Sequence, residues 1–150
     1  MSQSYNTALV NKIIADFQKG EKHSSFEKLK EFLNTNQEDN IARYNFALMC
    51  EELNYIDLAI DNYYQVIKND SKHWRSRFNL YLIFINQKKY EQALQLINKV
   101  LQIKLNYQPA LRDKAVVLYY LNKADEGLTY IQKSLTQNPL DYIALNTLGL

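Results

Sequence analysis

The sequence predicts an all-α fold made of repeated helical hairpins, and three observations lead to this prediction. Glycine and proline are scarce, with 3 and 2 in 150 residues, whereas an all-β fold needs more of both for its turns. Apolar residues recur at helical spacing, as in Leu94, Ile97 and Leu101. The same pattern returns every 34 residues without a gap. A period of that length accommodates two helices of about 12 residues and a turn.

The repeat becomes visible when residues 40–73 are laid over residues 74–107. Ala59 then aligns with Ala93, and the apolar positions around them coincide. A third copy follows over residues 108–141. Each copy contains two amphipathic blocks, and polar residues such as Lys88-Lys89 mark the turn between them.

We therefore divide the chain into five units. They are a degenerate N-terminal unit over residues 1–39, full units over 40–73, 74–107 and 108–141, and the truncated first helix of a further unit over 142–150. In the first unit, the first-helix pattern fits better if the turn is one residue shorter than elsewhere; the residues concerned are Val10, Ile13, Ile14 and Phe17.

This pattern resembles the tetratricopeptide repeat (TPR) family over roughly residues 6–150. The residues that carry the resemblance are Ala59, Tyr63 and Ser71; Leu80, Phe84, Tyr90 and Ala93; Leu118, Gly127, Ser134 and Pro139; and Leu148 and Gly149. Gly127 and Gly149 stand at positions where the family has small residues, which implies that neighbouring helices approach closely there. The resemblance implies a right-handed superhelical array of helix–turn–helix repeats that binds proteins. Arg43, Arg77, Lys12 and Lys114 depart from it, because the family usually has apolar side chains at these positions. Tyr81 also departs, because it stands at a position where the family has a small residue.

Charge and composition narrow the class of function. The chain has 18 lysines and arginines against 16 aspartates and glutamates, for a net charge of +2. Residues 1–75 carry a net charge of −2 and residues 76–150 carry +4, a gradient too mild for a nucleic-acid-binding surface. The first 20 residues lack a secretory signal, and the longest apolar runs are far too short to cross a bilayer. These features predict a cytoplasmic protein that binds neither nucleic acid nor membrane.

No catalytic, metal or cofactor chemistry is indicated. His23 and His73 have no cysteine or histidine at ligand spacing. Cys50 has neither a histidine nor a cation beside it, so we interpret it as a buried, inert thiol. Glu51 and Glu52 are neighbours that diverge on a helix, and we interpret them as solvated surface. Glycine-rich phosphate loops and GxSxG or HExxH motifs do not occur. We therefore expect no enzyme activity, no metal and no cofactor.

The family resemblance implies a concave groove lined by the first helix of each repeat. With residues 40, 74 and 108 counted as position 1, the family's groove positions are 2, 5, 9, 12 and 13. Several of these positions are aromatic or aliphatic here, which predicts an adhesive channel, unless some of them pack between repeats as core. The groove candidates are Tyr44, Phe78, Tyr119 and Tyr120 as anchors, Asn45 and Asn79 as ligands of a peptide backbone, and Arg75 and Arg112 as a bias towards acidic ligands.

Position 6 carries Asn45 and Asn79, and Asn11 if the first unit keeps strict register. An amide side chain offers one acceptor and two donors, enough to pair with a peptide unit of any sequence. Repeated asparagines form such a ladder in the related arrays of O-linked glycosyltransferases. The ladder is interrupted at Asp113 and Thr147, and an asparagine at this position can equally well cap or decorate its own helix.

The sequence thus predicts a non-catalytic protein-interaction scaffold that binds a peptide or helix in its concave groove. The carboxylate clamp by which the family grips chaperone C-termini is absent, which argues against a cochaperone. The chain stops at Leu150 within an expected helix and without a polar capping helix. Two alternatives therefore stay open. The chain is the N-terminal TPR targeting arm of a larger enzyme of the transferase type, or it is a self-assembling module that forms a homo-oligomer through its uncapped C-terminal end.

Overall fold

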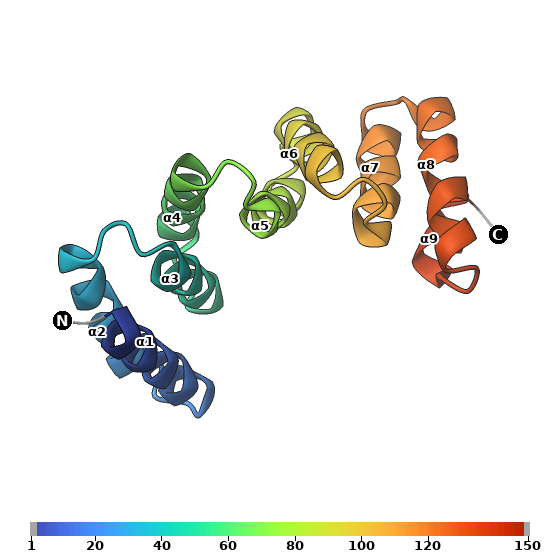
Figure 1. The fold of residues 1–150 in the computed structure, drawn as a ribbon. Helices are drawn as coiled ribbons and strands as arrows, with labels where there is room; N and C mark the ends of the chain where they lie inside the picture. The colour runs from blue at the N-terminus through green and yellow to red at the C-terminus, as the bar shows by residue number, and fades with distance from the viewer. Residues whose placement is uncertain (1–2, 149–150) are drawn as a thin grey trace. The chain divides into compact units, whose positions relative to one another are not determined.

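The structure is a computed structural model that describes residues 3–148, and all regular structure within that range is helical (Figure 1). The prediction of an all-α fold is confirmed. The helices are α1 (Gln3–Gln18), α2 (Lys22–Thr35), α3 (Asn40–Glu52), α4 (Ile56–Asn69), α5 (Trp74–Asn86), α6 (Tyr90–Ile103), α7 (Gln108–Tyr120), α8 (Ala124–Gln137) and α9 (Tyr142–Leu148).

The helix boundaries recur with the period of the sequence. First helices of the hairpins begin at Asn40, Trp74, Gln108 and Tyr142, each 34 residues after the one before. Second helices begin at Lys22, Ile56, Tyr90 and Ala124, with the same spacing. The local sequence therefore specifies where each helix starts and stops, although few residues are identical between the repeats.

Each hairpin turn contains one residue with a positive φ, and these residues are also 34 apart. They are Gly20, Asn54, Lys88 and Asn122, with φ values of 108°, 63°, 58° and 58°. In all four turns the next amide donates to the carbonyl five residues earlier, as Tyr55 N does to Cys50 O at 2.7 Å. This is the Schellman ending of a helix, which bonds carbonyls that the helix leaves unpaired.

The first turn does not follow the sequence expectation. Three residues separate α1 from α2, and three separate the helices of each later hairpin, so the turn is not one residue short. Instead, α1 buries Val10, Ile13 and Phe17. The residues 34 before the buried Phe46 and Cys50 are Lys12 and Asp16, of which Lys12 is exposed and Asp16 half-buried. Compared with the equivalent helix α3, the apolar face of α1 is therefore displaced by one residue, and the turn after α1 has the same length as the later turns.

Small side chains allow the two helices of a hairpin to approach closely. Ser25, Ala59, Ala93 and Gly127 stand at the same repeat position, and all four are buried. A Cβ on Gly127 would lie 3.1 Å from the carbonyl oxygen of Ala115, which confirms the close contact expected there. Gly149, expected at a similar contact, lies outside the described residues.

The chain divides into two compact units, Met1–His73 and Trp74–Leu150, called unit 1 and unit 2 below. Unit 1 contains α1–α4, and aromatic packing fills its core, where the Phe26 ring lies 5.0 Å from Phe46 and 5.3 Å from Tyr55. Unit 2 contains α5–α9, and Ile131 packs there with Ala115 and Ala144. Over residues 3–148, no helix has the length and apolar character needed to cross a bilayer.

Candidate functional site

Reactive groups are few in the described part of the chain. Cys50 is fully buried, and burial raises the pKa of its thiol to about 12, so the thiol stays protonated. Within residues 3–148, no group of three or more histidine, cysteine or acidic residues is arranged to hold a metal. Glu51 differs from the expectation of a solvated carboxylate, because it is half-buried and burial raises its pKa. Glu52 is exposed and forms an ion pair with Lys22.

Three tyrosines form a surface patch in unit 2, called the tyrosine patch here. Tyr120 stacks on Tyr90 with ring centroids 4.8 Å apart and planes 8° apart. Tyr119 meets Tyr120 edge-on at 5.8 Å. Tyr119 and Tyr120, at the end of α7, are nevertheless 61% and 51% exposed. Their neighbours restrain these rings, so binding a partner costs them little side-chain entropy.

Tyr44 and Phe78, the other predicted anchors, are half-buried and pack mainly within their own units. The Tyr44 ring lies 5.9 Å from Tyr63 and 5.0 Å from His73. The Phe78 ring lies 5.7 Å from Tyr81 and 5.5 Å from Tyr107. Each ring therefore has only part of its surface left for a ligand.

The two predicted groove arginines have different environments. Arg75 is exposed, and its guanidinium lies 4.7 Å from the centre of the Trp74 ring. The Arg112 side chain is 20% exposed and pairs with Asp113 at 2.9 Å and with Asp141 at 3.4 Å. Of the two, Arg75 is the more accessible to an acidic ligand.

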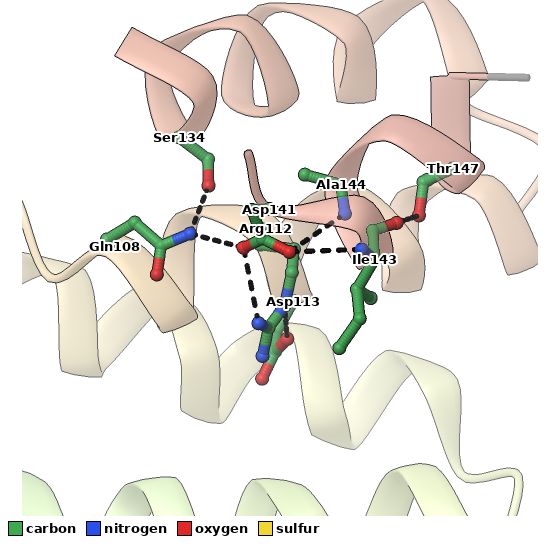
Figure 2. A network of polar contacts seen from close by, with 8 residues as sticks. All are labelled: Gln108, Arg112, Asp113, Ser134, Asp141, Ile143, Ala144 and Thr147. Atoms are coloured by element: carbon green, nitrogen blue, oxygen red, sulfur yellow. Dashed lines mark hydrogen bonds and ion pairs between the residues drawn. The ribbon is translucent and has the colours of Figure 1, made fainter. Parts of the chain in front are cut away.

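Arg112 belongs to a polar network that connects α7, α8 and α9 (Figure 2). Gln108 Nε2 donates to Ser134 Oγ at 2.8 Å and to Asp141 Oδ2 at 2.5 Å. Asp141 Oδ1 accepts hydrogen bonds from the backbone amides of Ile143 and Ala144, and so caps the start of α9. The network pairs a half-buried guanidinium with two carboxylates from the same unit.

The pKa values of the two carboxylates in this network are shifted in opposite directions. Burial raises the pKa of Asp113, and the Arg112 charge opposes the rise without cancelling it. Burial also acts to raise the pKa of Asp141, but hydrogen bonds from Ala144 and Gln108 and the charge of Arg112 outweigh it, so the pKa is lowered. Asp141 is therefore the better stabilised anion of the two. Tyr81, the large residue at a small position, is buried near Asp113 and Arg112.

Asn45 and Asn79 lie in different units. The Asn45 amide donates to Ile41 O within its own helix at 2.8 Å, which leaves its Oδ1 as an acceptor. Asn79 is half-buried and has interactions of its own. The asparagine ladder therefore stays a prediction.

Sequence reasoning missed three hollows in unit 1, all at the loop between α2 and α3. The largest, about 470 Å³, is lined mostly by amide and hydroxyl side chains, among them Asn6, Asn36 and Asn40. The other two meet at Arg43. The available signal was Arg43 itself, a charged residue where the repeat pattern calls for an apolar one.

Comparison with solved structures identifies the fold. YrrB, described as a TPR protein with an unusual peptide-binding site, matches with a TM-score of 0.81 and 17% identity, over 99% of this chain and 77% of its own. MamA matches with a TM-score of 0.81 and 18% identity, over 89% of this chain and 78% of its own. MamA from Desulfovibrio magneticus RS-1 matches with a TM-score of 0.80 and 16% identity, over 89% of this chain and 76% of its own. No family model and no curated protein matches the sequence. At these identities the likeness establishes the fold alone, and the chain has the tetratricopeptide-repeat fold.

Proposed function

We propose that this chain is a non-catalytic interaction module and that it binds a polypeptide segment on the first-helix face of unit 2. We define that face by the exposed groove-position residues of α5 and α7, which are Arg75, Leu82, Asn86, Tyr119 and Tyr120. A peptide-binding site is named for YrrB, which shares the fold.

The observation that carries the proposal is the exposure of large apolar side chains at these positions. Tyr119, Tyr120 and Leu82 are 61%, 51% and 40% exposed. Tyrosines fixed by aromatic neighbours are typical anchors of protein interfaces, because they bury a large area and can also donate a hydrogen bond. The tyrosine patch therefore supplies most of the binding energy in this proposal.

The net charge of unit 2 predicts which ligands it prefers. Unit 2 contains ten lysines and arginines and five aspartates and glutamates, for a net charge of +5. Arg75 is exposed on the proposed face. A positive surface accelerates the association of acidic partners and disfavours basic ones. We therefore expect the bound segment to combine acidic residues with at least one apolar side chain.

Unit 1 offers a smaller version of the same face. Ile41 and Leu48 are exposed groove-position residues of α3, and Tyr44 lies between them in the sequence. Asn45 keeps a free Oδ1 that can accept from a peptide N–H. Under this proposal Asn45 and Asn79 each contact a ligand backbone, and substitution of either by alanine weakens binding by about 1 kcal/mol.

The test begins with selection of 12-residue peptides from a displayed random library on the wild-type protein. The selected peptides are then measured against Tyr119→Ala/Tyr120→Ala. We expect at least a tenfold loss of affinity, because each tyrosine is worth roughly 1 kcal/mol or more as an interface anchor. Selected sequences should be enriched in acidic residues.

The matched control is Tyr64→Ala. Tyr64 is 46% exposed, but it lies on α4, a second helix that does not contribute to the proposed face. It should leave the affinity unchanged. If the selected peptides bind the double variant as well as they bind the wild type, the proposed face is wrong.

A further inference from the structure

Arg43, on α3 in unit 1, is a half-buried guanidinium without a carboxylate partner among the described residues. Its Nη1 donates to Asn62 Oδ1 at 3.0 Å, and its Nη2 donates to the backbone oxygen of Gln37 at 2.9 Å. The third donor, Nε, is shielded from solvent and donates to no atom of residues 3–148. Arg43 therefore has a charge and a hydrogen-bond donor that unit 1 does not use.

Arg112 in unit 2 provides the reference for what such a guanidinium requires. It is also on a first helix and mostly covered, yet two carboxylates neutralise it. A guanidinium removed from water loses hydration energy, and an opposite charge with matched hydrogen bonds normally offsets that loss. Arg43 has only two neutral acceptors.

The Arg43 side chain lies beside open space. A hollow of about 260 Å³ is lined by Arg43, Asn62, Lys30, Asn34 and Phe46 among others. A second hollow of about 330 Å³ shares Arg43, Asn62 and Gln37 with the first, and Glu38 and Asp61 line it too. Together they form one open groove, called the Arg43 groove here, with residues from α2, α3 and α4 around it.

We propose that the Arg43 groove binds a partner segment that carries one acidic side chain, whose carboxylate pairs with Arg43. A carboxylate can accept from more than one guanidinium donor, and Nη1 and Nη2 each have a second N–H besides the one that they donate within unit 1. Lys30, at the rim of the first hollow, adds a second positive charge. The polar side chains of Asn34 and Gln37 suit the backbone of an extended segment.

The charges of the second hollow define the partner further. Glu38 and Asp61 line it, and neither forms an ion pair with Arg43. They repel a second carboxylate and favour a basic side chain. Alternate residues of an extended chain lie on one face at about 6.4–6.8 Å. The preferred ligand therefore has an acidic and a basic residue two positions apart, which also suits unit 1, where the net charge is −3.

This site is independent of the proposed function. It lies wholly in unit 1 and includes no residue of the first-helix face of unit 2. A failure of either proposal therefore leaves the other one standing.

The test follows the Nε–H resonance of Arg43 by NMR during titration of the full chain. The probe is the peptide acetyl-Ala-Glu-Ala-Lys-Ala-amide, and Arg43→Lys assigns the resonance by removing it. We expect a saturable shift with the glutamate peptide and at least tenfold weaker binding when glutamine replaces the glutamate, because charge-assisted hydrogen bonds are lost. Sodium acetate at the same concentration should produce a much smaller shift. The proposal would be overturned if acetate or the glutamine peptide shifted the resonance as much as the glutamate peptide does. It would also be overturned if neither peptide shifted it.

A pair of variants tests the site without removing Arg43. Asn62→Asp is nearly isosteric and supplies a carboxylate from within the chain to Nη1, so it should abolish peptide binding. Gln65→Glu adds the same charge, but in the second hollow, so it should keep or strengthen binding through the peptide lysine. Circular dichroism checks that both variants fold. Wild-type affinity in Asn62→Asp, or equal losses in the two variants, would show that Arg43 does not receive the carboxylate.

Discussion

Units 1 and 2 use the same helical frame and differ in charge. Unit 1 has eight lysines and arginines and eleven aspartates and glutamates, a net charge of −3, whereas unit 2 has a net charge of +5. Both have half-buried arginines on their first helices, Arg43 in unit 1 and Arg77 and Arg112 in unit 2. Arg112 in unit 2 is paired with two carboxylates, and Arg43 in unit 1 is held by an amide and a backbone carbonyl.

The comparison shows that the frame and the polar interactions are specified separately. The helix boundaries, the positive-φ turn residues and the small buried residues all keep the 34-residue spacing in both units. Some charges keep this spacing, as Asp57, Glu91 and Asp125 do, but the paired ones do not: the position of Arg112 holds Tyr44 and Phe78 in the other full repeats. A stable repeat frame therefore lets each unit carry its own recognition chemistry.

The largest expected effect is the loss of unfolding free energy in Arg112→Met, which we compare with the loss in Arg43→Met. Methionine keeps much of the apolar packing of the arginine stem while removing the charge. Arg112→Met leaves two mostly buried carboxylates without a cation, and we expect a loss of about 3 kcal/mol of unfolding free energy. Arg43→Met removes a charge that has no partner and leaves two neutral acceptors, so about 1 kcal/mol or less is expected.

Urea unfolding measures both variants. Trp74 is the only tryptophan and lies in unit 2, so its fluorescence reports Arg112→Met, and circular dichroism reports Arg43→Met. Equal losses in the two variants would remove the distinction between a paired and an unpaired arginine.

A smaller effect depends on pH and on Asp113. Its pKa in the folded chain is raised by burial, so its protonated form is favoured by folding. The resulting stability is fully present below the unfolded pKa of about 3.9 and is lost as the pH rises through the folded pKa. Asp141, with a lowered pKa, behaves in the opposite way, and its contribution is lost as the pH falls through its folded value.

Asp113→Asn isolates the first of these contributions. We expect the stability of the wild type, relative to the variant, to increase as the pH falls from 7 towards 4. Other carboxylates titrate in both proteins and largely cancel in the difference. The measurement is the urea midpoint of Trp74 fluorescence at several pH values, and a difference that stays flat or decreases on acidification would contradict the burial of a raised-pKa carboxylate.

The fold could be predicted from the sequence because its determinants are local. Lys88-Lys89 marked a turn correctly, and Gly127 marked a close helix contact. The first turn was predicted one residue too short, because an apolar pattern reports which face of a helix is buried. Each residue turns a helix by about 100°, so a rotation of α1 by that angle moves its apolar face by one residue, as a deletion in the turn would.

The polar sites could not be predicted in the same way. Arg112 pairs with Asp141, 29 residues later, and Tyr120 stacks on Tyr90, 30 residues earlier. The same repeat positions also meet elsewhere, as Phe78 and Tyr107 do, so the period indicates which positions come into contact. It does not indicate whether the two side chains there form an ion pair or a ring stack. Arg43 stood out in the sequence as a charge at a usually apolar position, but only the structure shows the hollow beside it.

The smallest expected effect concerns the turn residues with a positive φ, whose residue types differ between the two units. Unit 1 has Gly20 and Asn54 at its positive-φ positions, and both residue types tolerate that conformation, whereas unit 2 has Lys88. Lys88→Gly should therefore raise the unfolding free energy of unit 2 by about 0.5–1 kcal/mol, since relief of backbone strain exceeds the added entropy of the unfolded chain. Asn122→Gly, at the equivalent turn of the same unit, should gain only a few tenths of a kcal/mol, because asparagine already accepts positive φ. Both variants are read by Trp74 fluorescence, and equal gains would mean that the lysine side chain carries no more strain in this turn than an asparagine.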